Sequence, residues 1–168
     1  MPPASIYGGD AVALLINIVL YQPEIPHNTG NIARTCAATG AMLHLIYPLG
    51  FTLDEKHLKR AGLDYWDEVN IREHSSWAAF QEAYPDAGCY YLSTKGRRRY
   101  TEVKYQPGDF LVFGPETRGL PADILEPAGA RVLRIPMRAG LRSLNLANSV
   151  AIVLYEALRQ LDFPGLTP

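Results

Sequence analysis

Short apolar runs alternate with helical segments along most of this chain, and this alternation constrains the fold more than any other feature of the sequence. Short apolar strands that are separated by helices pair in parallel, because each helix carries the chain back across the sheet. The sequence therefore predicts an α/β fold, a mainly parallel sheet with helices on both faces. The runs that we assign to strands are 15–20, 43–47, 68–71, 89–92, 110–113 and 131–135.

The final helix gives the clearest periodic signal in the chain. Its apolar side chains recur every three or four residues, which is the spacing of one buried helix face. Ser143 is placed to cap the first turn of this helix. The apolar stripe consists of Leu144, Ala147, Ala151, Leu154, Leu158 and Leu161.

The first helix is expected at 30–39, after a loop at 22–27 whose two prolines exclude both a helix and a central strand. Asn28 is placed to cap this helix and Gly40 to end it. Two shorter helices are expected, near 54–60 and from Ser75 or Ser76 to residue 82.

The composition predicts one domain without a metal site. The length of 168 residues suits a single domain, which we place at 15–168, after an extension at 1–14 that is rich in Pro, Gly and Ala. The two cysteines and four histidines lack metal-ligand spacing, and their pattern indicates a reducing compartment. The most apolar stretch, 11–21, is too short to span a bilayer, so we expect a cytoplasmic protein.

Positive charge is concentrated in one segment. The chain has 16 basic and 17 acidic residues, a balance that argues against coating nucleic acid by bulk charge. Residues 95–99 nevertheless contain four of the basic side chains and no acidic one. This basic loop follows a strand and is placed to contact RNA phosphates, although a solvated loop without a ligand explains it as well.

Three polar segments follow apolar strands and carry candidate chemistry. In the first, Asn28 and Asn31 begin a helix whose free N–H groups favour an anion, and Arg34 follows within two turns. In the second, Gly114 allows close approach of a ligand, and Glu116 lies in the following turn. The alternatives are a capping asparagine with a surface arginine, and an ordinary turn in which Glu116 and Arg118 form an exposed ion pair.

The third segment places Asn145, Asn148 and Ser149 in the first turns of the final helix. Asparagine is unfavourable inside a helix, so its presence there indicates that these polar side chains have a functional role. The alternative is that they only cap the helix. None of the three segments contains a P-loop, a GxGxxG fingerprint or a GxSxG elbow. Common nucleotide-binding and α/β-hydrolase sites are therefore poor explanations.

Taken together and in this order, the segments resemble the SPOUT RNA 2′-O-methyltransferases of the TrmH-like branch, and most closely those that methylate nucleotide 34 of tRNA. The resemblance covers about residues 16–165. One departure is the run of three arginines at 97–99, which extends the Lys-Gly that this family usually has there. The motifs that carry the resemblance are 17–31, 60–65, 113–120 and 135–148.

This resemblance implies a deep trefoil knot at the carboxyl end, a homodimer, and S-adenosylmethionine as the methyl donor, without a metal. It assigns the donor pocket to Leu92, Gly114, Ile135 and Ser143. It assigns catalytic roles to Arg34, Asn28, Glu116, Ser143 and Asn145. It places Tyr155 near the dimer seam, and we expect the RNA surface to include this tyrosine with Lys95, Arg97, Arg98 and Arg99.

The implied reaction is methylation of the ribose 2′-hydroxyl of the wobble nucleotide 34, a cytidine or modified uridine, in the anticodon loop. Arginine is protonated at neutral pH, so Arg34 either orients a phosphate or acts as a base in surroundings that remove its proton. Two other interpretations stay open. The chain either methylates another tRNA or rRNA position, or it is a knotted RNA-binding module without catalysis.

Overall fold

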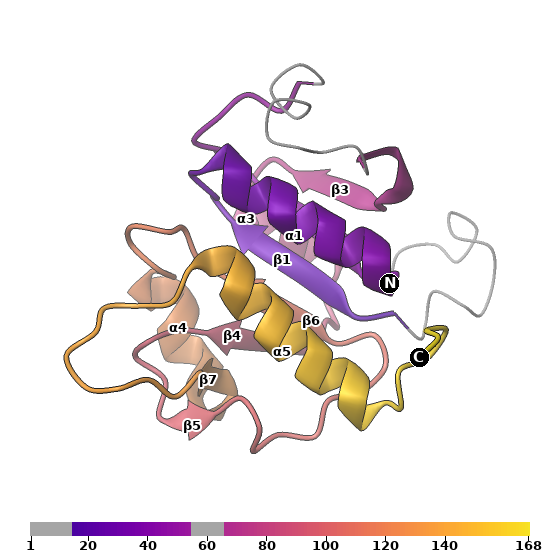
Figure 1. Cartoon of the computed structure of the whole chain (residues 1–168). Helices are drawn as coiled ribbons and strands as arrows, with labels where there is room; N and C mark the ends of the chain where they lie inside the picture. The colour runs from indigo at the N-terminus through magenta and orange to yellow at the C-terminus, as the bar shows by residue number, and fades with distance from the viewer. Residues whose placement is uncertain (1–14, 55–65) are drawn as a thin grey trace.

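The computed structural model describes residues 15–54 and 66–168, and in these ranges seven parallel strands form one sheet in the order β3-β2-β1-β6-β4-β7-β5 (Figure 1). The predicted extension at 1–14 and most of the helix predicted near 54–60 lie outside the described residues. The strands are β1 (Asn17–Tyr21), β2 (Met42–Ile46), β3 (Ile71–His74), β4 (Cys89–Leu92), β5 (Arg98–Arg99), β6 (Phe110–Phe113) and β7 (Val132–Arg134).

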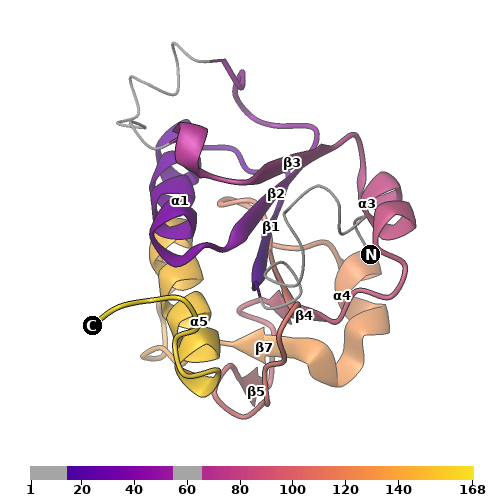
Figure 2. The same ribbon diagram turned by 90° about the vertical axis from the view of Figure 1, so that its right-hand side faces the viewer.

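Helices cover both faces of the sheet, as Figures 1 and 2 show. The two long helices, α1 (Pro26–Thr39) and α5 (Leu146–Gln160), lie side by side on one face. The short helices α3 (Trp77–Ala83) and α4 (Ala122–Ala128) lie on the other face. The predicted α/β class is therefore confirmed, whereas the knot that the resemblance implies stays a prediction.

Each face of the sheet has its own apolar core. On the α1 and α5 side the core includes Ile18, Leu43 and Leu154, and on the α3 and α4 side it includes Val19 and Phe80. Strands buried on both faces need apolar residues at nearly every position, which explains why the central strands read as continuous apolar runs. Each fully buried side chain of this size contributes roughly 1.5–3 kcal/mol.

The two long helices begin at residues that the sequence did not indicate. α1 begins at Pro26, with proline in its first turn, so Asn28 lies inside the helix and is not its cap. α5 is capped by Asn145, whose side chain accepts a hydrogen bond from the backbone N–H of Asn148, so the prediction that Ser143 is the cap was wrong. Gly40 ends α1 in a left-handed conformation, as predicted.

Several other element boundaries also differ from expectation. The strand expected at 68–71 begins at Ile71, because the preceding residues form the 3-10 helix η3 (Trp66–Glu68). Inside the basic loop, β5 pairs with β7 through Arg98 and Arg99, an element that the polar sequence did not suggest. Neither α4 nor the short 3-10 helix η4 (Gly129–Arg131) was expected.

The long connection at 93–109 is held to the end of α5. The Gln160 side chain accepts a hydrogen bond from the backbone N–H of Tyr105 at 2.9 Å and donates one to the carbonyl of Val103 at 3.1 Å. The Tyr105 ring is 1% exposed. The last turn of α5 therefore fixes the loop that links β4 to β6.

A chain of three polar side chains is buried beneath α3. His44 Nε2 lies 3.0 Å from Asn17 Oδ1, and His44 Nδ1 lies 3.1 Å from His74 Nε2. Asn17 Nδ2 donates to the carbonyl of Gly108, so its Oδ1 accepts the His44 Nε2–H and leaves His44 Nδ1 to accept from His74. The His44 ring is therefore neutral, since one of its nitrogens donates and the other accepts. Burial lowers the pKa of His44 to about 3 and also lowers the pKa of His74.

This buried pair predicts a loss of stability in mild acid. Unfolded histidine titrates near pH ~6.5, well above the folded-state pKa of His44 and above the lowered pKa of His74, so the unfolded chain binds more protons below that pH. We expect His44 to lower the free energy of unfolding by roughly 1.4 kcal/mol per pH unit as the pH drops below ~6.5, and His74 to add to this loss in the same direction. Urea denaturation from pH 7.5 to pH 5 measures this slope.

Two variants serve as controls for the acid effect. His74→Phe removes one titrating group and should flatten the slope, whereas His27→Gln alters an exposed histidine and should leave it unchanged. An identical slope in His74→Phe and the unmodified protein would show that His74 does not contribute to acid stability.

No helix within 15–54 and 66–168 combines the length and apolar character that a membrane crossing requires.

Candidate functional site

The carboxyl ends of β4, β6 and β7 open into a cavity of about 570 Å³. Its walls come from the loops after these strands and from the beginnings of α1 and α5. Loops from neighbouring parallel strands converge at such an edge, which is where these sheets bind ligands. The predicted site residues that line the cavity are Asn28, Leu92, Lys95, Gly114, Glu116, Ile135, Ser143 and Asn145.

Gly114 begins the tight turn that forms one wall of the cavity. A Cβ atom here would lie 2.9 Å from the Cα atom of Gly119 and even closer to the backbone N of Leu120. Gly119 has φ +68° and donates its N–H to the carbonyl of Pro115 at 2.9 Å. The sequence suggested that glycine admits a ligand, but the group that needs the space is the backbone of this same turn.

The Glu116 carboxylate joins this turn to the start of α1. It accepts hydrogen bonds from the backbone N–H of Glu24 at 2.8 Å, from that of Ile25 at 3.1 Å, and from Asn28 Nδ2 at 3.3 Å. The Arg118 guanidinium instead donates to the Gln22 side chain at 3.4 Å. The alternative of an ordinary turn with an exposed Glu116–Arg118 ion pair is therefore wrong.

Asn28 extends this network to the beginning of α5. Its Oδ1 accepts a hydrogen bond from Asn145 Nδ2 at 3.1 Å, and Asn145 Oδ1 accepts the N–H of Asn148 at 3.2 Å. Asn28 is 7% exposed, so these bonds satisfy an amide that would be costly to bury alone. The three polar segments of the sequence thus meet through Glu116, Asn28 and Asn145.

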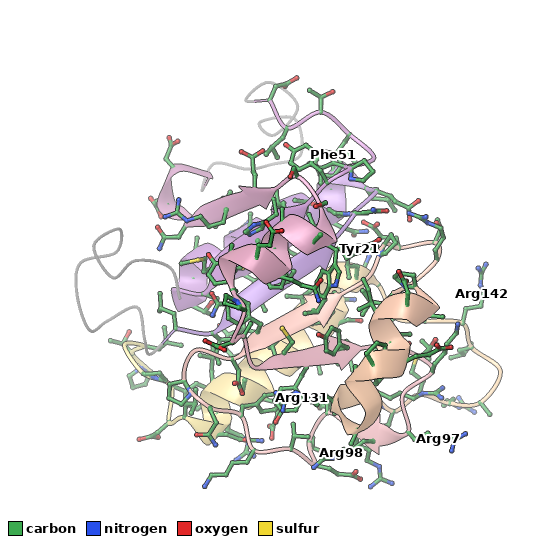
Figure 3. All side chains as sticks on the ribbon, turned by 180° about the vertical axis from the view of Figure 1, so that it is seen from behind. Tyr21, Phe51, Arg97, Arg98, Arg131 and Arg142 are labelled. Carbon is green, nitrogen blue, oxygen red and sulfur yellow. The ribbon has the colours of Figure 1, made fainter. Side chains whose placement is uncertain are left out.

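The cavity lining is rich in positive charge. It contains the basic side chains of Lys95, Arg118, Arg134 and Arg142, and Glu116 is its one carboxylate. The Glu116 oxygens accept three N–H donors, and its single negative charge offsets only one of the four cations. Arg142 projects outward from the loop before α5 (Figure 3). Such a rim attracts an anionic ligand.

Outside the basic loop, whose three arginines also lie off the cavity, two predicted residues do not line it: Arg34 and Tyr155. Arg34 lies on the exposed side of α1, six residues beyond Asn28, which places it about 9 Å farther along the helix axis. Tyr155 lies on α5 and is 45% exposed. A single copy of the chain therefore brings together the residues predicted for the donor pocket but not Arg34.

The three arginines of the basic loop differ in the contacts that they make. The Arg98 guanidinium donates to the carbonyls of Ala130 and Glu102, both at 3.3 Å, and Arg99 lies 4.0 Å from the Glu102 carboxylate. Arg97 is exposed, and Figure 3 shows it at the outer edge of the molecule beside β5. Arg97 and Lys95 are thus the members of this loop best placed for a phosphate.

Sequence reasoning missed three residues of the site region. Glu24 holds the turn after β6, because its carboxylate accepts hydrogen bonds from Thr117 N and Oγ1 at 2.9 Å and 2.7 Å. These bonds lower the pKa of Glu24. Arg134, at the end of β7, lines the cavity. The position of Arg134 at the end of an expected strand could have identified it as a site residue. No sequence feature predicts the contact between Glu24 and Thr117.

The two cysteines lie away from this chemistry. Both are free and buried, and burial raises the pKa of Cys36 to about 12 and that of Cys89 to about 11. Neither thiol supplies a reactive thiolate at neutral pH.

Large apolar side chains are exposed on α5, in the loop before it and just before α1. On α5, Ile152 and Tyr155 are 37% and 45% exposed, and Leu141 and Leu144 in the preceding loop are 65% and 40% exposed. Ile25, just before α1, is 42% exposed. Apolar exposure on neighbouring elements is typical of a surface that packs against another molecule.

Comparison with known proteins identifies close relatives of this chain. A tRNA (cytidine(34)-2′-O)-methyltransferase of Escherichia coli is 53% identical over 152 residues, which cover 90% of this chain and 97% of the relative. A solved structure described as giving insights into 2-OH methylation of C/U34 on tRNA superposes with a TM-score of 0.83. It is 52% identical and covers 89% of this chain and 98% of its own.

A more distant structure is that of an S-adenosylmethionine-bound rRNA methyltransferase from Sinorhizobium meliloti. It superposes with a TM-score of 0.80 at 26% identity, over 96% of this chain and 61% of its own. The sequence motifs of residues 15–155 match those of the SpoU rRNA methylases. The match spans the sheet, the cavity and most of α5, so the chain belongs to the SpoU rRNA Methylase family.

Proposed function

We propose that this protein transfers a methyl group from S-adenosylmethionine to the ribose 2′-hydroxyl of nucleotide 34, a cytidine or modified uridine, in the anticodon loop of tRNA. The observation that carries the proposal is the meeting of the three polar segments at one cavity. Support for the substrate comes from the 53% identity to a relative named for this reaction. A tRNA substrate also favours a cytoplasmic location.

The cavity fits the proposed donor in size and in chemistry. Its volume of about 570 Å³ lies in the range of pockets for nucleoside-sized ligands. Leu92, Ile135 and Leu144 provide apolar surface for an adenine ring. Gly114 and Ser143 line the same space, and strand-end backbone groups can bind the ribose. The donor supplies a methyl group on a positively charged sulfur, which leaves as a neutral thioether.

The polar residues have separate proposed tasks. Glu116, Asn28 and Asn145 hold the walls of the donor pocket together through their mutual hydrogen bonds. Alignment of the attacking oxygen with the methyl carbon and sulfur is worth ~7–11 kcal/mol, and these fixed walls provide it. Arg34 acts at the ribose, where its charge orients the neighbouring phosphate or its surroundings make it the base.

A homodimer completes this site. The exposed apolar side chains of α5 and its preceding loop form a face suited to a second copy of the chain. Since Arg34 lies outside the cavity of its own chain, we assign its action to the cavity of the partner. The dimer also supplies the RNA surface, in which Tyr155 lies near the seam between the two copies.

The basic loop gives a specific prediction for RNA binding. Arg97→Ala should weaken tRNA binding several-fold and reduce the salt slope of binding by about one, because one phosphate contact is lost. Arg98→Ala should weaken binding less, because its guanidinium already donates to Ala130 and Glu102. Filter binding at several salt concentrations measures both effects. Equal losses in both variants would contradict this division of roles.

Nucleotide mapping tests the proposed function itself. The protein is incubated with labelled S-adenosylmethionine and total tRNA, and the labelled nucleotide is located. A 2′-O-methyl group at position 34 supports the proposal, and a label at another tRNA or rRNA position replaces its substrate. Donor binding without methyl transfer to any RNA would favour the non-catalytic RNA-binding module.

A further inference from the structure

We propose that Glu24 is a positioning residue for this reaction, acting by holding the turn at 114–120 against the start of α1. The inference rests on the proposed function and deepens it. Glu24 does not line the cavity, whereas its neighbour Ile25 and its partner Thr117 do. Its effect on catalysis must therefore pass through other residues.

The contact between the two segments is reciprocal. The Glu24 carboxylate accepts hydrogen bonds from Thr117 N at 2.9 Å and from Thr117 Oγ1 at 2.7 Å. In return, the Glu116 carboxylate accepts the backbone N–H groups of Glu24 at 2.8 Å and of Ile25 at 3.1 Å. Each carboxylate thus binds the backbone of the segment that carries the other. Hydrogen bonds to charged acceptors are stronger than neutral ones.

Gly50 fixes Glu24 from the opposite side. Its N–H donates to the carbonyl of Pro23 at 2.9 Å. A Cβ atom at position 50 would lie 2.7 Å from the Cα atom of Glu24 and 2.8 Å from its carbonyl oxygen. The loop after β2 therefore packs directly on the Glu24 backbone, and Glu24 is held between Gly50 and Thr117.

Hydrogen bonds connect the turn that Glu24 holds to the opposite wall of the cavity, at the start of α5. Glu116 also accepts a hydrogen bond from Asn28 Nδ2 at 3.3 Å, and Asn28 Oδ1 accepts one from Asn145 Nδ2 at 3.1 Å. Release of Thr117 from Glu24 lets the turn move and carries Glu116 with it. Asn28 and Asn145 then lose their fixed partners. A displacement of about 1 Å at such a site costs up to ~100-fold in rate.

A double-mutant cycle between Glu24 and Thr117 tests this role. We expect Glu24→Ala and Thr117→Val each to raise the dissociation constant of S-adenosylhomocysteine and to lower kcat by roughly 3- to 100-fold, with a smaller change in KM for tRNA. The double variant should be little worse than the more impaired single one. Thr117→Ser keeps the hydroxyl and should restore near-normal values.

The control and the readouts separate positioning from general destabilisation. Glu73→Ala removes another exposed carboxylate, one that accepts a hydrogen bond from the Tyr47 hydroxyl and contacts neither Glu24 nor Thr117, and it should change neither binding nor kcat. The melting temperatures of all variants should stay close to that of the unmodified protein. If Glu24→Ala fails to fold, the comparison of donor affinity and kcat between Thr117→Val and Thr117→Ser tests the inference by itself.

Additive effects in the cycle, or equal activity of Thr117→Val and Thr117→Ser, would overturn the inference. Donor affinity is measured by calorimetry without RNA, so this result does not depend on which nucleotide is methylated. Absence of methyl transfer to nucleotide 34 by the unmodified protein would instead overturn the proposed function and leave the binding cycle interpretable.

Discussion

Replacement of Gly114 by alanine is expected to weaken donor binding by at least about 100-fold, because the turn that forms the cavity wall cannot close around a methyl group. The added Cβ would meet the backbone of Gly119 and Leu120, and backbone cannot rotate away as a flexible side chain does. The turn must open, which also displaces Glu116. Calorimetry with S-adenosylhomocysteine measures the loss directly.

Gly129→Ala is the matched control for this substitution. Gly129 has φ +55°, so alanine is strained there, but nothing lies within 4 Å of its added Cβ and it does not line the cavity. A loss of stability on the order of 1–3 kcal/mol with normal donor affinity is expected. Normal donor affinity in Gly114→Ala would show that the turn does not form the donor site.

Arg34→Ala should lower methyl transfer to tRNA by roughly 100- to 10,000-fold while donor affinity stays normal, because Arg34 is assigned to the ribose and lies outside the cavity. Arg34→Lys keeps the positive charge and separates the two possible roles. Substantial activity in the lysine variant indicates phosphate orientation, since a single charge suffices for it. Single-turnover rates and tRNA binding are measured separately.

Mixing the two inactive chains provides the control for Arg34. In a heterodimer of Arg34→Ala and Gly114→Ala chains, one cavity has both an intact turn and an intact arginine if Arg34 acts across the dimer. Random pairing should then restore about a quarter of the normal activity. No restoration by mixing would confine Arg34 to its own chain, and full turnover by Arg34→Ala alone would remove it from the mechanism.

The fold class could be predicted from the sequence because it depends on the local pattern of apolar and polar residues. The short, largely apolar runs at β1, β2 and β6 are typical of strands buried on both faces, and the stripe of α5 defines its buried side. Element ends were harder to place. Ser143 and Asn145 are both good caps, and only the bond from Asn145 to the N–H of Asn148 decides between them.

The individual residues of the site could be predicted from the sequence, but the hydrogen bonds between them could not. Asn28, Glu116 and Asn145 could be selected because polar residues after buried strands indicate a ligand edge. Their mutual hydrogen bonds join residues that are 88 and 117 positions apart, and local pattern carries no information on such pairs. Glu24 was missed for the same reason, because its partner Thr117 lies 93 residues away.

The order in which the ribosome makes the chain has a consequence for the cavity. One wall belongs to Ser143, Asn145 and the beginning of α5, and the end of α5 also anchors the loop between β4 and β6 through Gln160. These elements follow the other lining residues in the sequence, so they are synthesised after the rest of the cavity wall. A nascent or prematurely terminated chain that ends before α5 therefore lacks a donor pocket and cannot withdraw methyl donor from the cell.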